Sequence, residues 1–286
     1  AVHTPLQAPE AATRKYQRKL RKAGLAVGGK KDDADLVTDR QGVTKTVQNN
    51  PVYAAMVERT DDSLGRIMQA LKDAGVDGNT AIILTSDHGG LSTRGLMNGR
   101  ALATSNLPLR QGKGSIFEGG TRVPLIVKWP GRIAAGSMSS VQVTGTDHYP
   151  TMLQIAGAPL NPKQHVDGRS YIKALQGQAY QRDAMFWYKW QARPDSTGDT
   201  RAISLIDGNF KLVQWIDEEL VELFDLSKDI SERRNLATKM PGRTREMLTT
   251  LREMESSIGN LREKGRKELQ RRLQKQRNEK SKSVQK

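Results

Sequence analysis

Residues 81–90 read Ala-Ile-Ile-Leu-Thr-Ser-Asp-His-Gly-Gly, and the fold prediction rests on this stretch. Four apolar residues in a row, bounded by turn residues, are typical of a strand buried on both faces, because a half-exposed strand alternates. In open α/β sheets the chemistry sits just beyond the carboxyl ends of the strands. Asp87 and His88 fall there and offer a carboxylate and an imidazole to a metal ion. In a rival interpretation of equal weight, Asp87 caps a helix and His88 is merely exposed.

A helix precedes this strand and a second apolar run follows it. Asn50-Pro51 opens a segment in which apolar residues recur at helical spacing through Ala74. The second apolar run spans residues 125–129. The order helix, turn, strand predicts an α/β fold with a parallel sheet and crossover helices. Between the two runs, residues 91–111 form a long loop of the kind that commonly carries function.

A lysine between two glycines marks a second feature of chemical interest. In Gly112-Lys113-Gly114 the flexible backbone can approach an anion while the ammonium of Lys113 contacts it as a point charge. Residues 118–124, Glu-Gly-Gly-Thr-Arg-Val-Pro, then lead into the second apolar run. These residue types predict a metal site beside an oxyanion site.

Charge is concentrated at the two ends of the 286-residue chain. Of the net charge of +15, residues 261–286 contribute 11 Lys/Arg against 3 Glu, and residues 1–50 contribute 10 Lys/Arg against 5 acids. The middle is nearly neutral, and no aromatic residues interrupt the basic tail, which argues against a specific nucleic-acid partner. The chain has no cysteine and no apolar run long enough to span a bilayer, so disulfides, thiolate metal sites and a transmembrane segment are excluded from it.

The carboxyl-terminal third predicts a small antiparallel sheet with one helix. Strands are expected at 186–188, 202–206, 209–215 and 222–226, with Asp207-Gly208 as a hairpin turn. A helix is expected over about 242–258. Residues 8–50 predict a short helix followed by a surface loop, and 139–146 a further strand. The tail, 261–286, predicts a solvated helix, with contact to polyanions as a minority interpretation.

Three motifs together resemble the type I sulfatases, the formylglycine-dependent enzymes of the alkaline-phosphatase-like superfamily. They are S-D-H-G-G at 86–90, G-K-G-x-x-x-E-G-G-x-R-V-P at 112–124, and W-P-G at 129–131. The resemblance runs from residue 1 to about Gly259. It implies a mixed or parallel α/β sheet flanked by helices, incomplete at the N-terminus, plus the small carboxyl-terminal sheet. The domains expected are a core at 1–180, an α+β subdomain at 181–260 and a basic tail at 261–286.

The resemblance also implies a role for each site residue. Asp87 and His88 are expected to ligate Ca²⁺, with Mg²⁺ as the second choice, although the family often has Asn where this chain has His88. Lys113 is expected to contact a sulfuryl oxygen of the substrate. His3, in an H-x-P segment, is expected to protonate the leaving oxygen. His165 lies in a loop where the family binds substrate, and a substrate contact is expected there.

The family's nucleophile is missing from this sequence. It is a formylglycine made from Cys or Ser in a C/S-x-P-x-R motif, and the chain has neither a cysteine nor an S-x-P-x-R segment. That motif and an aspartate pair are expected upstream of residue 1, so the chain as given is expected to be inactive. The implied function is sulfuric ester hydrolysis, on a sulfated polysaccharide, in the periplasm or outside the cell. A phosphomonoester or phosphonate hydrolase of the same superfamily and a non-catalytic polyanion-binding fragment stay open as alternatives.

Overall fold

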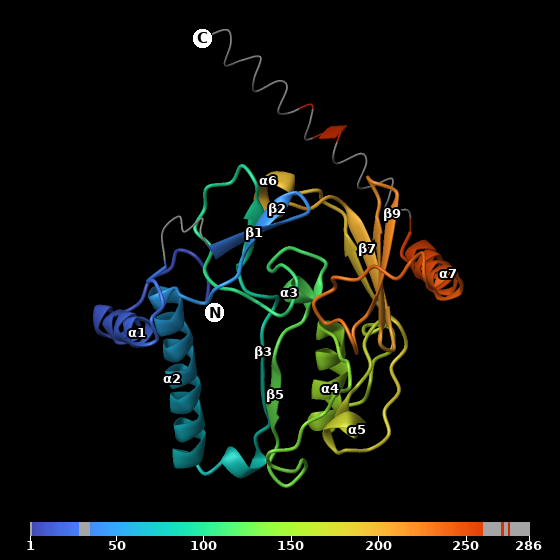
Figure 1. Cartoon of the computed structure of the whole chain (residues 1–286). Helices are drawn as coiled ribbons and strands as arrows, with labels where there is room; N and C mark the ends of the chain where they lie inside the picture. Colours follow the sequence, from blue (N-terminus) through green and yellow to red (C-terminus); the bar gives the residue numbers. More distant parts are fainter. Residues whose placement is uncertain (1, 29–34, 260–269, 272–273, 275–286) are drawn as a thin grey trace. The chain divides into compact units, whose positions relative to one another are not determined.

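The chain forms two compact units, each assembled from segments that are separated in sequence. A computed structural model describes residues 2–28, 35–259, 270–271 and 274 (Figure 1). The first unit comprises Ala1–Gly29, Asn49–His88 and Arg122–Asp183, and the second comprises Lys30–Gln48, Gly89–Thr121 and Ala184–Lys286. Most of the basic tail, for which a solvated helix is predicted, lies outside the described residues. Within the described ranges, no helix combines the length and apolarity needed to cross a membrane.

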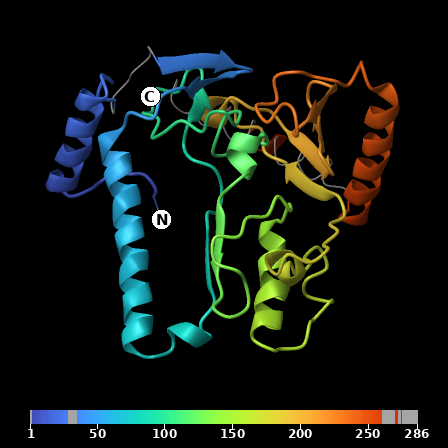
Figure 2. The ribbon, with the colours of Figure 1, turned by 60° about the horizontal axis from the view of Figure 1, so that its bottom comes forward.

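The first unit is organised around a long helix that begins where the sequence predicts. The Asn50 side chain accepts hydrogen bonds from the backbone N–H groups of Val52 and Tyr53, both at 3.1 Å, and so caps the helix α2. The helix α1 lies against α2 (Figures 1 and 2). The helical elements of this unit are α1 (Glu10–Lys22), α2 (Pro51–Asp73), η2 (Asp77–Asn79), η3 (Gly145–Asp147), α4 (His148–Ile155) and α5 (Ile172–Leu175).

Two strands complete the first unit, and their pairing corrects the prediction of a parallel sheet. The strand β3 (Ile82–Thr85) pairs antiparallel with β5 (Leu125–Lys128), with Ile82 opposite Lys128. All strand pairs among the described residues are antiparallel. The apolar part of β3 is only half-buried, so its continuous apolar run does not mark a strand covered on both faces in this chain. The strand predicted at 139–146 is also wrong: alternation alone forms no strand without a neighbouring ladder.

The second unit contains the predicted antiparallel sheet and its helix. Gly208, with φ +57°, occupies the hairpin turn that Asp207-Gly208 predicts. The strands lie in the order β6-β7-β8-β9, and Figure 2 shows the helix α7 beside them. Their bounds are β6 (Met185–Lys189), β7 (Ala202–Asp207), β8 (Phe210–Trp215), β9 (Leu220–Asp225) and α7 (Pro241–Ser257).

Both faces of this sheet are buried, by different parts of the chain. Because side chains alternate along a strand, Leu212 faces a cluster that contains Met247 and Leu251 of α7. Val213 and Trp215 face a second cluster, which includes Phe117 and the neighbouring Ile116. The segment that follows Lys113 in sequence therefore covers one face of the carboxyl-terminal sheet.

A second, smaller sheet lies in a region predicted to be a surface loop. Asp39-Arg40-Gln41-Gly42 turns between two short strands, and Arg40 takes a left-handed conformation with φ +56°. The long loop 91–111 supplies the third strand. The elements are β1 (Leu36–Asp39), β2 (Gly42–Lys45) and β4 (Thr93–Gly95), with the short helices α3 (Glu118–Thr121) and α6 (Pro194–Thr197) in the same unit.

Candidate active site

The predicted metal pair directly follows β3, at the last residues of that segment of the first unit. Asp87 Oδ2 and His88 Nε2 are 3.2 Å apart, and 83% of the Asp87 side chain is exposed against 33% for His88. Ser86 Oγ donates to the His88 carbonyl at 2.8 Å, which fixes the turn after the strand. The strand end thus presents a carboxylate and an imidazole side by side.

Two donors are fewer than a divalent cation requires. Ca²⁺ takes about six to eight oxygen ligands, and carboxylates suit it better than imidazoles do. The described residues contain no group of three or more His, Cys, Asp or Glu side chains placed to hold a metal ion. The chemistry of Asp87 fits such an ion, but the pair supplies only part of a coordination shell.

The other two predicted histidines also belong to the first unit. His3 is exposed, and its Nδ1 lies 2.7 Å from the carbonyl oxygen of Thr4. His165 packs edge-on against Tyr149, with ring centroids 6.3 Å apart, and no described residue hydrogen bonds to its buried Nε2. His3 is therefore accessible to a substrate, whereas His165 has the surroundings of a packing residue. The substrate contact predicted for His165 stays a prediction.

Lys113 belongs to the second unit and sits on a loop held by its own backbone. Its N–H donates to the Gly90 carbonyl at 2.9 Å. Asn106 Nδ2 lies within hydrogen-bond distance of three carbonyls, those of Gly90 (3.0 Å), Gln111 (3.1 Å) and Gly119 (3.2 Å). Asn106 therefore joins the stretch before Lys113 to the stretch after it. The result is a half-buried lysine on a backbone that is held by several hydrogen bonds.

The glycines of the two motifs are required by how closely their backbones approach each other. Gly89 N–H donates to the Gly120 carbonyl at 3.0 Å, and Gly119 N–H donates to the Arg110 carbonyl at 2.8 Å. A Cβ atom on Gly89 would lie 1.7 Å from the Gly119 oxygen, and one on Gly119 would lie 2.2 Å from the Gln111 oxygen. Only glycine permits that contact. The glycines of the S-D-H-G-G and E-G-G motifs thus form two sides of one backbone contact within the second unit.

Beyond Lys113, the loop is anchored by an aromatic cluster. Phe117 is fully buried, with its ring centroid 5.6 Å from that of Trp215 and 6.3 Å from that of Phe224. The guanidinium carbon of Arg110 lies 3.8 Å from the Phe117 ring centroid. Aromatic pairs at these distances stabilise a packed core beyond their buried area.

A buried charge cluster lies next to these rings. Lys211 Nζ is 2.8 Å from Glu118 Oε1 and 3.0 Å from Glu232 Oε1, and all three residues are buried. Burial raises the pKa of Glu232 to about 7, because the favourable charge of Lys211 only partly offsets the loss of water and the Glu118 charge adds to the shift. Despite its own burial, Lys211 has a raised pKa, since two carboxylates face it. Glu118, the first residue of the E-G-G motif, is therefore part of the scaffold.

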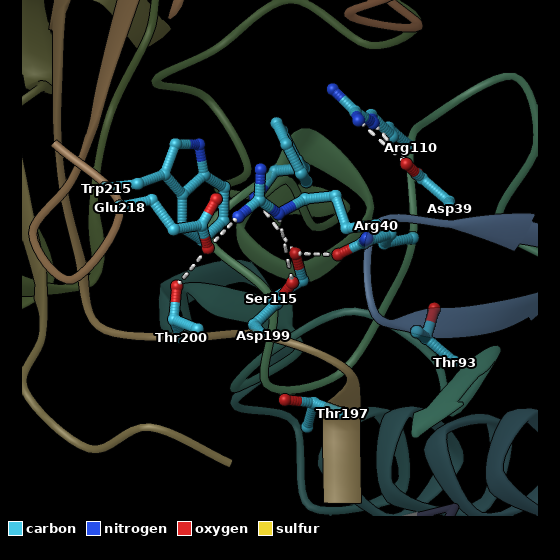
Figure 3. Close-up of polar contacts among 12 residues, drawn as sticks. Asp39, Arg40, Thr93, Arg110, Ser115, Thr197, Asp199, Thr200, Trp215 and Glu218 are labelled. Atoms are coloured by element: carbon cyan, nitrogen blue, oxygen red, sulfur yellow. Dashed lines mark hydrogen bonds and ion pairs between the residues drawn. The ribbon is translucent and has the colours of Figure 1, made fainter. Parts of the chain in front are cut away.

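Two arginines fasten the β1–β2 turn to the rest of the second unit (Figure 3). Arg110 donates to both carboxylate oxygens of Asp39, at 2.8 and 2.7 Å. Burial opposes ionisation of Asp39, but the Arg110 guanidinium outweighs it and holds the pKa of Asp39 below its ordinary value. Arg40 stacks on Trp215, with its guanidinium carbon 3.4 Å from the ring centroid, and donates to Glu218 at 2.6 Å. Bidentate and stacked geometries of this kind are specific to arginine.

Sequence reasoning missed most of these supporting residues. Glu232 lies in the polar run Ser-Glu-Arg-Arg-Asn at 231–235, which carries no sign of burial. One usable signal is the period of β8, because Lys211 is in phase with Val213 and Trp215 and must point to the same face. A lysine on an apolar face predicts a buried acidic partner.

Comparisons with known proteins match the parts of the chain that carry the motifs. A family model described as "Sulfatase" matches residues 1–158, and one described as "N-sulphoglucosamine sulphohydrolase, C-terminal" matches residues 112–264. The two matches overlap across the Lys113 loop. A curated protein named "Sulfatase" from Formosa agariphila is 37% identical over 208 residues, which are 66% of this chain and 36% of that protein. The chain thus spans little more than a third of that relative's length.

Two solved structures share the fold over most of this chain. One is the crystal structure of Ps i-CgsB in complex with k-i-k-neocarrahexaose, with a TM-score of 0.67 and 24% identity, covering 90% of this chain and 48% of that one. The other holds its substrate D-glucosamine-2-N,6-O-disulfate, with a TM-score of 0.61 and 25% identity, covering 75% of this chain and 42% of that one. In both cases the match takes in less than half of the solved chain.

Proposed function

Because this chain belongs to the sulfatase family, we propose that it carries part of the active site of a sulfuric ester hydrolase. The observation that supports this most directly is the overlap of both family matches on the Lys113 loop, whose backbone is caged in the second unit. A fixed ammonium stabilises charge on a sulfuryl oxygen without having to reorganise during the reaction. Lys113 is the residue proposed for that role.

The remaining roles belong to residues of the first unit. Asp87 and His88 would hold part of the shell of a divalent cation, and such an ion, when bound, polarises the sulfate and orients the ester. His3 is proposed as the general acid that protonates the leaving oxygen, since its side chain is exposed and histidine is the residue that most often serves as a general acid or base. The nucleophile is proposed to come from a segment outside these 286 residues, because the sequence holds neither cysteine nor an S-x-P-x-R motif.

The substrate is proposed to be a sulfated carbohydrate. Three findings favour it: the N-sulphoglucosamine sulphohydrolase family match, a similar structure with a bound neocarrahexaose, and another with a bound glucosamine disulfate. Such a substrate also agrees with a site outside the cytoplasm, in the periplasm or beyond.

The test is hydrolysis by this chain alone and after an upstream segment bearing the nucleophile motif has been joined to it. We expect no sulfate release from an aryl sulfate or from N-sulfoglucosamine by the chain alone, with or without Ca²⁺, and release by the longer protein. Lys113→Met in the longer protein should lower kcat/KM by a factor on the order of 10² to 10³, the loss typical of one charge-stabilising group. Lys128→Met, in β5 of the first unit, serves as the control. Release of phosphate or phosphonate products in place of sulfate would favour the alternative hydrolase.

A further inference from the structure

We propose that Glu232 and Lys211 are positioning residues for Lys113, which hold the loop carrying it from the side of the carboxyl-terminal sheet. This rests on the sulfate-contact role proposed for Lys113. Neither residue belongs to a motif of the sequence. Both lie more than ninety residues beyond the loop they hold, Lys211 on β8 and Glu232 after β9.

Glu232 binds both ends of the loop. Arg110 Nη1 donates to the Glu232 carbonyl at 3.0 Å, and the Glu118 N–H donates to Glu232 Oε2 at 2.7 Å. Lys113 lies between these two points. Glu232 itself takes φ +53° although it is not glycine, a conformation that persists only where the surroundings determine it. A single fully buried residue thus closes the segment 110–118.

The positive charge of Lys211 stabilises the two neighbouring carboxyl groups, those of Glu118 and Glu232, in a buried position. It is fully buried and lies in phase with Val213 and Trp215 on the face that packs against Phe117. Its ammonium is within 3.0 Å of both Glu118 and Glu232. Removing one member of a buried charge group is strongly destabilising, because the partners stay buried without compensation.

The surroundings of Glu232 allow its carboxyl to carry a proton on Oε1. Oε2 accepts from Glu118 N–H, but Oε1 accepts no well-formed hydrogen bond from any described residue, although Lys211 Nζ is only 3.0 Å away. The charged groups around this carboxyl come from three places. Lys211 of β8 and Glu118 of α3 contact the carboxyl itself, and Arg110 contacts the backbone carbonyl of the same residue. With the proton in place the cluster holds one ammonium, one carboxylate and one neutral acid, and its net charge is zero.

Ionisation of Glu232 therefore favours opening of the loop. In an opened state the carboxyl is hydrated and regains a pKa near its ordinary value of 4.5, whereas in the closed state the pKa is about 7. By linkage, the closed state binds more protons between these values, so opening grows by up to about tenfold per pH unit from about pH 5 to pH 7 and then levels off.

Amide hydrogen exchange of the 286-residue chain tests this without any turnover. We compare peptides covering 111–120 with peptides from α2 at pH 5.5 and 7, after correction for intrinsic exchange rates. Wild type should lose about tenfold in protection per pH unit at 111–120 and not in α2. Glu232→Gln keeps an oxygen acceptor but cannot ionise, so its protection should not follow pH. Lys211→Met should lower protection of 111–120 at both pH values.

The matched controls are Lys239→Met and Glu253→Gln, both on exposed side chains of the same unit. They should behave as wild type. The proposal is overturned if Glu232→Gln keeps the wild-type pH dependence, or if Lys211→Met leaves the exchange of 111–120 unchanged. Should Lys211→Met unfold the whole unit, the Glu232→Gln result alone decides. A failure of the sulfate-ester function would appear in the Lys113 assay and would leave these exchange patterns as they are.

Discussion

Replacing Phe117 by alanine tests whether the Lys113 loop is anchored by the carboxyl-terminal sheet. The ring is fully buried, contacts Trp215 and Phe224, and is covered by the Arg110 guanidinium. Truncating a buried Phe to Ala costs about 3–5 kcal/mol through lost transfer energy and the cavity left behind. Each aromatic contact contributes about 0.5–1.5 kcal/mol of its own, part of which is already contained in that range. We therefore expect Phe117→Ala to lower the free energy of unfolding by about 4 kcal/mol.

The assay is urea denaturation of the 286-residue chain, followed by the fluorescence of its tryptophans. Phe117→Leu fills most of the cavity and should lose only about 1–1.5 kcal/mol. Phe186→Ala is the matched control, because this half-buried ring packs at the margin of the opposite cluster and should lose less than Phe117→Ala. A loss below about 1 kcal/mol for Phe117→Ala would refute the reasoning, since the loop would then not depend on the sheet for its place.

Three further predictions follow from single contacts. Gly89→Ala should cost more than 3 kcal/mol or prevent folding of the second unit, because its Cβ would lie 1.7 Å from the Gly119 oxygen; an exposed glycine in α2, Gly65→Ala, is the control for circular dichroism melts. Asp147→Ala should cost about 3–5 kcal/mol in the same melts, because it strands the Arg182 guanidinium 2.6 Å away, and Asp147→Asn should cost less. For Glu232, the raised folded pKa of about 7 means that the contribution of this group to stability is fully present below about pH 4.5 and is lost as the pH rises to about 7. Glu232→Gln should remove up to about 3 kcal/mol of that pH-dependent loss, and identical pH dependences in urea titrations would contradict the assignment.

Local chemistry made part of the fold predictable. The helix start at Asn50-Pro51 and the hairpin at Asp207-Gly208 depend on residues that are neighbours in sequence, and the structure confirms both. The period of two in β8 places its side chains correctly on two faces. The sequence did not show which segments pack against each other. The continuous apolar run at Ile82–Leu84 predicts a parallel strand buried on both faces, but the strand pairs antiparallel and is half-buried. An apolar run indicates that a segment tends to be buried, but it does not identify the segment that packs against it.

The turn at Asp39-Arg40-Gln41-Gly42 is a second case in which distant contacts decide the local structure. It has none of the usual hairpin pairs such as Asn-Gly, and Arg40 takes the left-handed conformation that glycine normally occupies. Its stabilisation comes from Trp215 and Glu218, about 175 residues later, through stacking and an ion pair. No local pattern can encode a turn whose conformation is decided by such distant contacts. The sequence therefore predicted a loop where the structure has a hairpin.

In the candidate site too, some residues could be predicted from their sequence neighbours, whereas others depend on contacts with distant residues. Lys113 could be singled out because flexible glycines beside a lysine are a local signature of anion contact. By the same logic Glu118, five residues on, looks like a second reactive group. Its burial against Lys211 and Glu232 argues the opposite, since a carboxylate fully committed to a buried ammonium and facing no solvent is poorly placed to meet a substrate. The motif thus combines Lys113, which is suited to chemistry, with Glu118, which helps to hold Lys113 in place. Only the contacts of Glu118 with Lys211 of β8 and with Glu232 distinguish the two roles.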